Sequence, residues 1–116
     1  MNTRRSLTNW KSIIYSLLVM SISSPVSAGP PVVEIEIREH LFYPSDVEIP
    51  KDTKVKLLIK NLDSTPEEFE SYDLNREKVI SGNSKAVVFI GPLPAGEYHF
   101  FGEFHPKSAQ GRVIVK

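Results

Sequence analysis

The residues of this chain that can do chemistry are its histidines and a group of glutamates. The histidines are His40, His99 and His105, and the glutamates gather in the stretch Glu67-Glu68-Phe69-Glu70. Imidazole nitrogen binds iron, copper and zinc well, whereas carboxylate oxygen favours harder ions. A site that combined these donors could hold Cu(II), Fe(II), Fe(III), Mn(II) or Zn(II), so the metal cannot be named from affinity alone.

Sulfur ligands are missing from the part of the chain that would carry such a site. The chain has no cysteine, and its two methionines are Met1 and Met20. A blue copper centre needs a cysteine thiolate beside two histidines, so this chain cannot form one. The sequence also shows no arrangement typical of a covalent nucleophile and no phosphate-binding glycine loop, so nothing indicates an enzyme with a covalent intermediate.

The first 28 residues have the pattern of a secretory signal peptide. A basic segment is followed by a short apolar run over residues 13–22 and by the small residues Val26-Ser27-Ala28. The run is short for a membrane span, although an uncleaved N-terminal anchor is the alternative interpretation. Arg4-Arg5 partly resembles a twin-arginine export signal. We therefore expect a signal peptide over 1–28, a single domain over 29–116, and a periplasmic location reached by the Sec or the twin-arginine route.

The charge of the chain excludes two classes of partner. The formal net charge is zero, but Arg4, Arg5 and Lys11 lie in the predicted signal peptide, which leaves a mildly acidic domain. Such a domain gives no electrostatic reason to bind nucleic acid or an anionic membrane surface. We expect contact with a membrane only through a partner or through an uncleaved signal.

Short alternating segments predict an all-β domain that would position these side chains. Apolar and polar residues alternate over 32–38, 46–49, 53–60, 85–90 and 97–104, with a possible strand over 69–74 and a last one over 111–115. Turn residues separate them at intervals that are typical of a β-sandwich. The rings expected to fill its interior are Phe42, Phe69, Phe89, Tyr98 and Phe100.

The closing segment resembles that of the cupredoxins. It runs from Gly96-Glu97-Tyr98-His99-Phe100 to His105 and ends with Gly111-Arg112-Val113-Ile114-Val115, and the earlier segments Asn61…Pro66 and Phe42-Tyr43-Pro44 also match. This resemblance implies a Greek-key β-sandwich of cupredoxin type. It places Glu67 at the first histidine ligand, Gly102 at the cysteine, His105 at the second histidine, and Ala109 or Gln110 at the methionine.

The chain is also similar to the EfeO-type cupredoxin-like domains. The similar segments are Glu67-Glu68-Phe69-Glu70-Ser71, Leu74-Asn75-Arg76-Glu77-Lys78, Gly91-Pro92-Leu93 and Phe101-Gly102-Glu103-Phe104-His105. Such domains occur in or beside bacterial periplasmic iron-uptake systems. The resemblance implies a bound copper or iron ion, with an iron permease and a periplasmic iron-binding protein as partners.

The two resemblances imply a metal site at one end of the sandwich. Its expected ligands are His105, Glu67, His40 and Glu103, with Glu68 and Glu70 as a second tier. Alternation puts Glu67 on the side of Phe69, and Glu68 and Glu70 on the other side. Each has an ordinary interpretation as well: an exposed loop histidine, a histidine at a turn, or a solvated acidic edge.

Three functions follow as hypotheses. The first is a periplasmic metal-binding protein that assists ferrous iron uptake by oxidising iron or delivering it to a permease. The second is a metal-free module that docks a protein at the end of the sandwich, where Phe101 and Phe104 lie. The third is an electron-transfer protein, which the missing thiolate disfavours.

Overall fold

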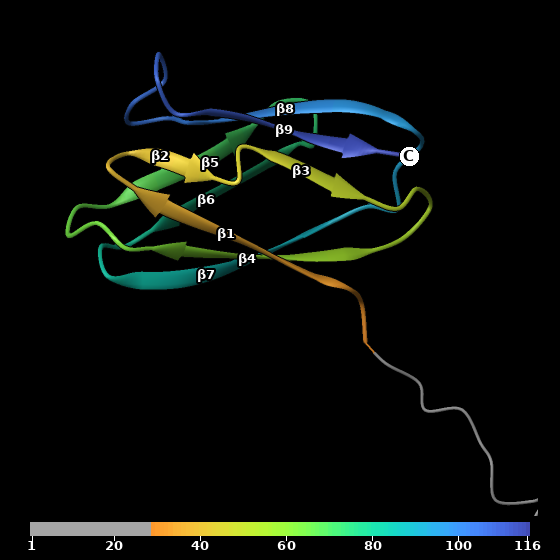
Figure 1. The fold of residues 1–116 in the computed structure, drawn as a ribbon, viewed down its shortest axis with the longest axis horizontal. Coiled ribbons are helices and arrows are strands. Elements are labelled where there is room, and N and C mark those ends of the chain that lie inside the picture. Colours follow the sequence, from red (N-terminus) through yellow and green to blue (C-terminus); the bar gives the residue numbers. More distant parts are fainter. Residues whose placement is uncertain (1–28) are drawn as a thin grey trace, which may run out of the picture.

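The computed structural model describes residues 29–116, which form nine β-strands in two sheets (Figure 1). The predicted signal peptide lies outside these residues. The first sheet has the strand order β2-β1-β4-β7 and consists of β1 (Val32–Arg38), β2 (Leu41–Tyr43), β4 (Val55–Asn61) and β7 (Ser84–Ile90). The second has the order β3-β9-β8-β5-β6 and consists of β3 (Asp46–Ile49), β5 (Glu67–Ser71), β6 (Arg76–Ile80), β8 (Gly96–Gly102) and β9 (Gln110–Val115).

Two of the strand pairs are parallel, and both join segments that are distant in the sequence. β1 lies beside β4, and β3 lies beside β9, while the other neighbours are antiparallel. The chain passes between the two sheets several times, and this arrangement confirms the predicted all-β sandwich. Within residues 29–116 we find no helical segment with the length and hydrophobicity of a membrane span.

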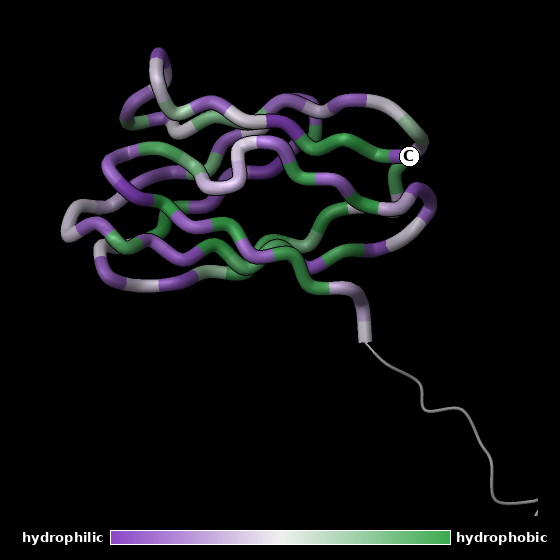
Figure 2. The backbone as a smooth tube through the Cα atoms, viewed as in Figure 1, coloured by the Kyte–Doolittle hydropathy of each residue, from purple (hydrophilic) through white to green (hydrophobic). Residues whose placement is uncertain are grey.

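Hydrophobic and hydrophilic residues alternate along several strands (Figure 2). The apolar side of these strands is buried between the two sheets, where the interior lies. Three rings predicted to fill it do so. Phe69 and Phe100 lie 4.9 Å apart between ring centroids, and Phe42 meets Phe100 edge-on at 5.1 Å. Tyr98 lies at the margin, where its hydroxyl donates to the carbonyl of Pro94.

The prediction for Phe89 is wrong. Its neighbours Val88 and Ile90 are buried, whereas Phe89 is 43% exposed and lies under the ammonium group of Lys54. Register explains the difference, because Val55 pairs with Ile90 and Leu57 with Val88, which turns both partners inward. Phe89 has the opposite parity and therefore faces solvent.

The strand ends also differ from the prediction in places. The sequence pattern does not predict β2 or β6, because one is very short and the other has four exposed residues. The possible strand at 69–74 is instead β5, which begins at Glu67. Leu74 follows in the turn but is still buried.

One end of the sandwich gathers three connections that are far apart in the sequence (Figure 1). They are the β1–β2 turn at residues 39–40, the β4–β5 loop at 62–66 and the β8–β9 loop at 103–109. The predicted metal ligands come from these connections and from β5. The fold thus brings the candidate residues to a single end of the molecule.

Candidate metal site

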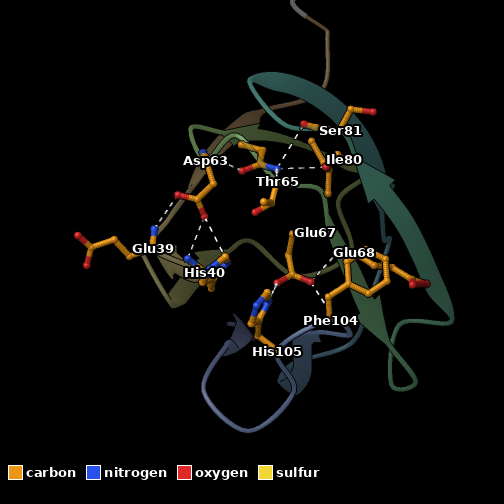
Figure 3. Close-up of polar contacts among 11 residues, drawn as sticks. Glu39, His40, Asp63, Thr65, Glu67, Glu68, Ile80, Ser81, Phe104 and His105 are labelled. Atoms are coloured by element: carbon orange, nitrogen blue, oxygen red, sulfur yellow. Dashed lines mark hydrogen bonds and ion pairs between the residues drawn. The ribbon is translucent and has the colours of Figure 1, made fainter.

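Three of the predicted ligands come together at this end. His40, Glu67 and His105 each offer one nitrogen or oxygen atom, and these atoms all lie within 4.8 Å of one another. His40 comes from the β1–β2 turn, Glu67 opens β5, and His105 belongs to the β8–β9 loop. Figure 3 shows the Glu67 carboxylate and the imidazole of His105 pointing toward each other, with His40 beside them.

Glu67 is the buried member of the group. It is 1% exposed, since its strand alternates Glu67, Phe69 and Ser71 toward the interior. A buried carboxylate is costly unless it is hydrogen-bonded. Here Oε1 accepts from the backbone N–H groups of Glu68 at 2.8 Å and Phe104 at 3.0 Å, and Oε2 lies 2.7 Å from Nδ1 of His105. Three contacts therefore fix the carboxylate in one orientation.

A tight turn in the β8–β9 loop positions His105. Its N–H donates to the carbonyl of Gly102 at 3.0 Å, and its own carbonyl accepts from Ala109 at 2.9 Å. The side chain is 35% exposed, so the ring touches both Glu67 and solvent. An ion could reach this imidazole from outside without any opening of the sandwich.

The turn that carries His40 adopts an unusual backbone conformation. Glu39 and His40 have φ angles of 50° and 62°, the left-handed region in which side chains other than glycine are strained. The carboxylate of Asp63 accepts the backbone N–H groups of both residues, at 2.8 and 2.9 Å. Asp63 thereby stabilises the turn that sets the direction of His40.

The rings of His40 and His105 stack. Their centroids lie 3.8 Å apart with 17° between the planes. Asp63 also lies 3.7 Å from Nδ1 of His40, so a second carboxylate borders the pair. The hydrogen bonds from the backbone N–H groups of His40 and Glu39, together with the nearby imidazoles, hold the pKa of Asp63 below its ordinary value despite its partial burial.

The other predicted ligands lie apart from this group. Glu68 and Glu70 are on the outer face of β5, where they form a separate acidic group with Glu77 of β6. Glu103 is not a member of the group of three, and its backbone N–H donates to the carbonyl of Glu68 at 2.9 Å. His99 bonds to Gln110 at 2.8 Å on the outer face of β8, as its parity predicts.

Two residues position the site although the sequence does not predict this role for either of them. Asp63 lies within the segment Asn61…Pro66 that resembles the cupredoxins, and Asn61 begins it. Asn61 is 1% exposed, and its amide donates to the carbonyls of Thr65 and Ile80 while its oxygen accepts from the N–H of Asp63. The pattern Asn-x-Asp after a strand, typical of a side-chain-stabilised turn, is the signal that could have revealed both.

The donor set of these three residues fits a non-blue metal centre. Two imidazoles and one carboxylate are ligands of copper(II), zinc and iron(II), and two histidines with one carboxylate are the ligands of many non-haem iron(II) sites. The chain has no cysteine, so the thiolate of a blue copper site is absent. The residues therefore suit a divalent ion, but not the redox couple of a blue copper protein.

Comparison with known proteins places the chain in a family. The model of the cupredoxin-like domain family matches residues 11–115. The chain belongs to this family. One relative of this cupredoxin-like protein is the Uncharacterized protein RP394 of Rickettsia prowazekii (strain Madrid E), 48% identical over 83 residues. That match covers 72% of this chain and 66% of the relative, so it spans just under two thirds of the relative's length.

Solved structures similar to this cupredoxin-like protein include copper proteins. A copper binding protein in its apo form matches with a TM-score of 0.68 and 19% identity, over 79% of this chain and 93% of that one. Auracyanin A, a "blue" copper protein of Chloroflexus aurantiacus, matches with a TM-score of 0.65 and 16% identity, over 76% and 100%. The metal-binding domain of the Cu(I)-exporting ATPase CopA of Streptococcus pneumoniae D39 matches with 0.66 and 14%, over 80% and 92%. At these identities the similarity establishes the fold.

Proposed function

We propose that this chain is an exported metal-binding protein of the EfeO-type branch of the cupredoxin-like family, and that His40, Glu67 and His105 bind its ion. The observation that carries the proposal is the position of the Glu67 carboxylate, buried and 2.7 Å from Nδ1 of His105. A carboxylate and two imidazoles from three distant segments then meet at one point.

Copper(II) and iron(II) are the ions we propose. Copper(II) lies at the top of the affinity order for nitrogen and oxygen sites, so it is the ion expected to bind most tightly in solution. Iron(II) is supported by the ligand set and by the resemblance to domains of iron-uptake systems. We propose that the protein assists ferrous iron uptake by delivering the ion to a permease. The exposed edges of His40 and His105, 43% and 35% for the side chains, favour exchange with a partner.

Metal titration of the purified protein tests the proposal. We expect the wild-type protein to bind one Cu(II), with EPR features of nitrogen and oxygen ligands, and to bind Fe(II) under anaerobic conditions. The double variant Glu67→Gln/His105→Asn should lose that binding. Dissociation constants weaker than about 1 mM for both ions, or binding that the double variant leaves unchanged, would contradict the proposal.

Two variants serve as matched controls. His99→Asn removes an exposed imidazole that bonds to Gln110 on the outer face of β8, and Glu103→Gln removes a carboxylate outside the group of three. Both should leave the affinity for Cu(II) within about twofold of wild type, because neither donor reaches the proposed ion. A large loss in Glu103→Gln would instead add that residue to the site.

A metal-free docking module is the second candidate. Phe104 is 48% exposed directly beside His105, and its backbone is fixed by Glu67. Copurification from the periplasm tests this alternative. A metal-free protein that is recovered with a permease or a periplasmic partner, and whose recovery is lost in Phe104→Ser but not in His105→Asn, would favour docking over metal binding.

A further inference from the structure

Gly102 is the residue of β8 that faces the carboxylate of Glu67. A Cβ atom at this position would lie 2.9 Å from Cδ and 3.0 Å from Oε2 of Glu67, and 2.8 Å from Cβ of Ala109. Carbon atoms do not approach so closely without displacement of a neighbour. A side chain at residue 102 and the carboxylate of Glu67 therefore compete for the same space.

Backbone conformation does not explain the glycine. Among the glycines of residues 29–116, Gly91 and Gly96 are the two with positive φ, and Gly102 is not one of them. Its backbone is instead held in place, since its N–H donates to Ala109 at 2.8 Å and its carbonyl accepts from His105 at 3.0 Å. What position 102 requires is the absence of a side chain.

Glu67 cannot easily yield that space. Its Oε1 is held by the N–H groups of Glu68 and Phe104, and its Oε2 by His105. A shift large enough to admit a methyl group would lengthen at least one of these three contacts. The contact with His105 is the one that joins the two proposed ligands.

We propose that Gly102 is a specificity-determining position of the metal site, which acts by leaving room for the carboxylate of Glu67. The inference rests on the proposed function. Because residue 102 has no side chain, the third donor beside His40 and His105 is a carboxylate oxygen supplied by β5. Gly102 thus sets the preference of the site for ions that accept oxygen ligands.

A double-mutant cycle with Gly102→Ala and Glu67→Ala tests this role. Gly102→Ala should weaken Cu(II) binding by about 10- to 100-fold, the usual effect of disturbing a group that orients a ligand. In a protein that already carries Glu67→Ala, the same change should have little further effect, because the carboxylate and the space that it occupied are no longer contested. Losses that simply add in the double variant would overturn the inference.

Ala109 requires its own control, since the new Cβ would also meet this residue. Ala109→Gly removes that contact, and it provides a second background in which Gly102→Ala is easier to accommodate in the fold. We expect Gly102→Ala/Ala109→Gly to recover thermal stability relative to Gly102→Ala, but to bind Cu(II) as weakly. Recovery of affinity to the level of Ala109→Gly would show that packing of the loop, and not Glu67, is what the glycine protects.

A readout without metal separates this inference from the proposed function. In the metal-free protein, the amide NMR signals of Glu68 and Phe104 report the carboxylate that they bond. Both should shift in Gly102→Ala. Signals that stay unchanged while wild-type protein binds copper would overturn the inference alone. Signals that shift while wild-type protein binds neither Cu(II) nor Fe(II) would establish the displaced carboxylate and overturn the metal function.

Discussion

His40 and His105 stack ring on ring with 3.8 Å between their centroids, although one lies in the first hairpin and the other in the last loop. Neither histidine lies in a strand, and each is held in place by a carboxylate from another segment of the chain. Asp63 fixes the turn below His40, and Glu67 bonds to His105. Two carboxylates from the β4–β5 region therefore determine how the two imidazoles meet.

Removal of the Asp63 carboxylate should weaken both the turn at Glu39 and His40 and the binding of the ion. We expect Asp63→Ala to lower the free energy of unfolding by about 1–3 kcal/mol, because the N–H groups of Glu39 and His40 lose their acceptor in a strained turn. The affinity for Cu(II) should fall by about 10- to 100-fold. Urea denaturation and metal titration measure the two effects.

Asp73→Ala is the matched control for that variant. Asp73 also accepts a backbone N–H, that of His99 at 2.8 Å, but it lies away from the three proposed ligands. The Asp73→Ala variant should lose stability but keep its affinity for Cu(II). An equal loss of affinity in both variants would mean that reduced stability, rather than the position of His40, weakens the site.

The stabilising effect of Asp63 should depend on pH. Its folded-state pKa lies below the ordinary value of 3.8, mainly because of the hydrogen bond from the backbone of His40. The stability that it contributes is therefore present above pH 3.8 and is lost as the pH falls through the lower, folded-state pKa. The difference in unfolding free energy between wild type and Asp63→Asn, measured without metal, should shrink in that acidic range. A constant difference down to about pH 2 would contradict this.

The acidic group of Glu68, Glu70 and Glu77 on the outer face should have the opposite pH dependence to Asp63: its effect on stability is unfavourable at neutral pH and is relieved in acid. Burial first, and the nearby charge of Glu77 second, raise the pKa values of Glu68 and Glu70 above 4.5, and Oε2 of Glu70 has no hydrogen-bond partner among the described residues. Repulsion between these carboxylates then costs stability above the raised pKa values, and the cost disappears as the pH falls toward 4.5. We expect Glu77→Gln to raise the urea midpoint at pH 7 and to have less effect near pH 4.5.

Glu48→Gln is the control for Glu77→Gln, because it also removes one negative charge from the domain. Glu48 lies 3.3 Å from the ammonium group of Lys116, so its removal should bring no gain at pH 7. If both variants were equally stabilised, the effect would belong to the net charge of the domain. The specific arrangement of Glu68, Glu70 and Glu77 would then not be responsible.

Metal should stabilise the folded protein. At a free Cu(II) concentration about 100-fold above the dissociation constant, a ligand that binds only the folded state adds about 2.7 kcal/mol to the free energy of unfolding. Thermal unfolding should therefore shift upward with Cu(II), and a chelator should reverse the shift. The double variant Glu67→Gln/His105→Asn should show neither change, and an equal shift in it would place the ion elsewhere.

The sequence predicts the sandwich well because alternation determines which face of each strand is buried. Residues 32–38 alternate strictly and form β1, and Glu67 shares the buried side of β5 with Phe69 as its parity requires. The size of Phe89 suggests an interior position, although its parity on β7 opposes that of Val88 and Ile90. The size of a side chain is a weaker guide than its register.

The site is harder to predict than the strands because it depends on contacts between loops. Glu103 and Glu67 are both glutamates at the same end of the sandwich, and only the three-dimensional path of the β8–β9 loop separates them. The role of Asp63 is likewise a side-chain contact with a backbone turn more than 20 residues earlier. No periodic pattern records such a contact.

The spacing of the three proposed ligands along the chain has a consequence for the order of events during synthesis. His40, Glu67 and His105 come from the first hairpin, from the start of β5 and from the β8–β9 loop. A nascent polypeptide that has not yet reached residue 105 would lack one of the three donors. If the ion binds as we propose, it can be held by all three residues only after residue 105 has been made, so it could not assist the folding of the segments before it.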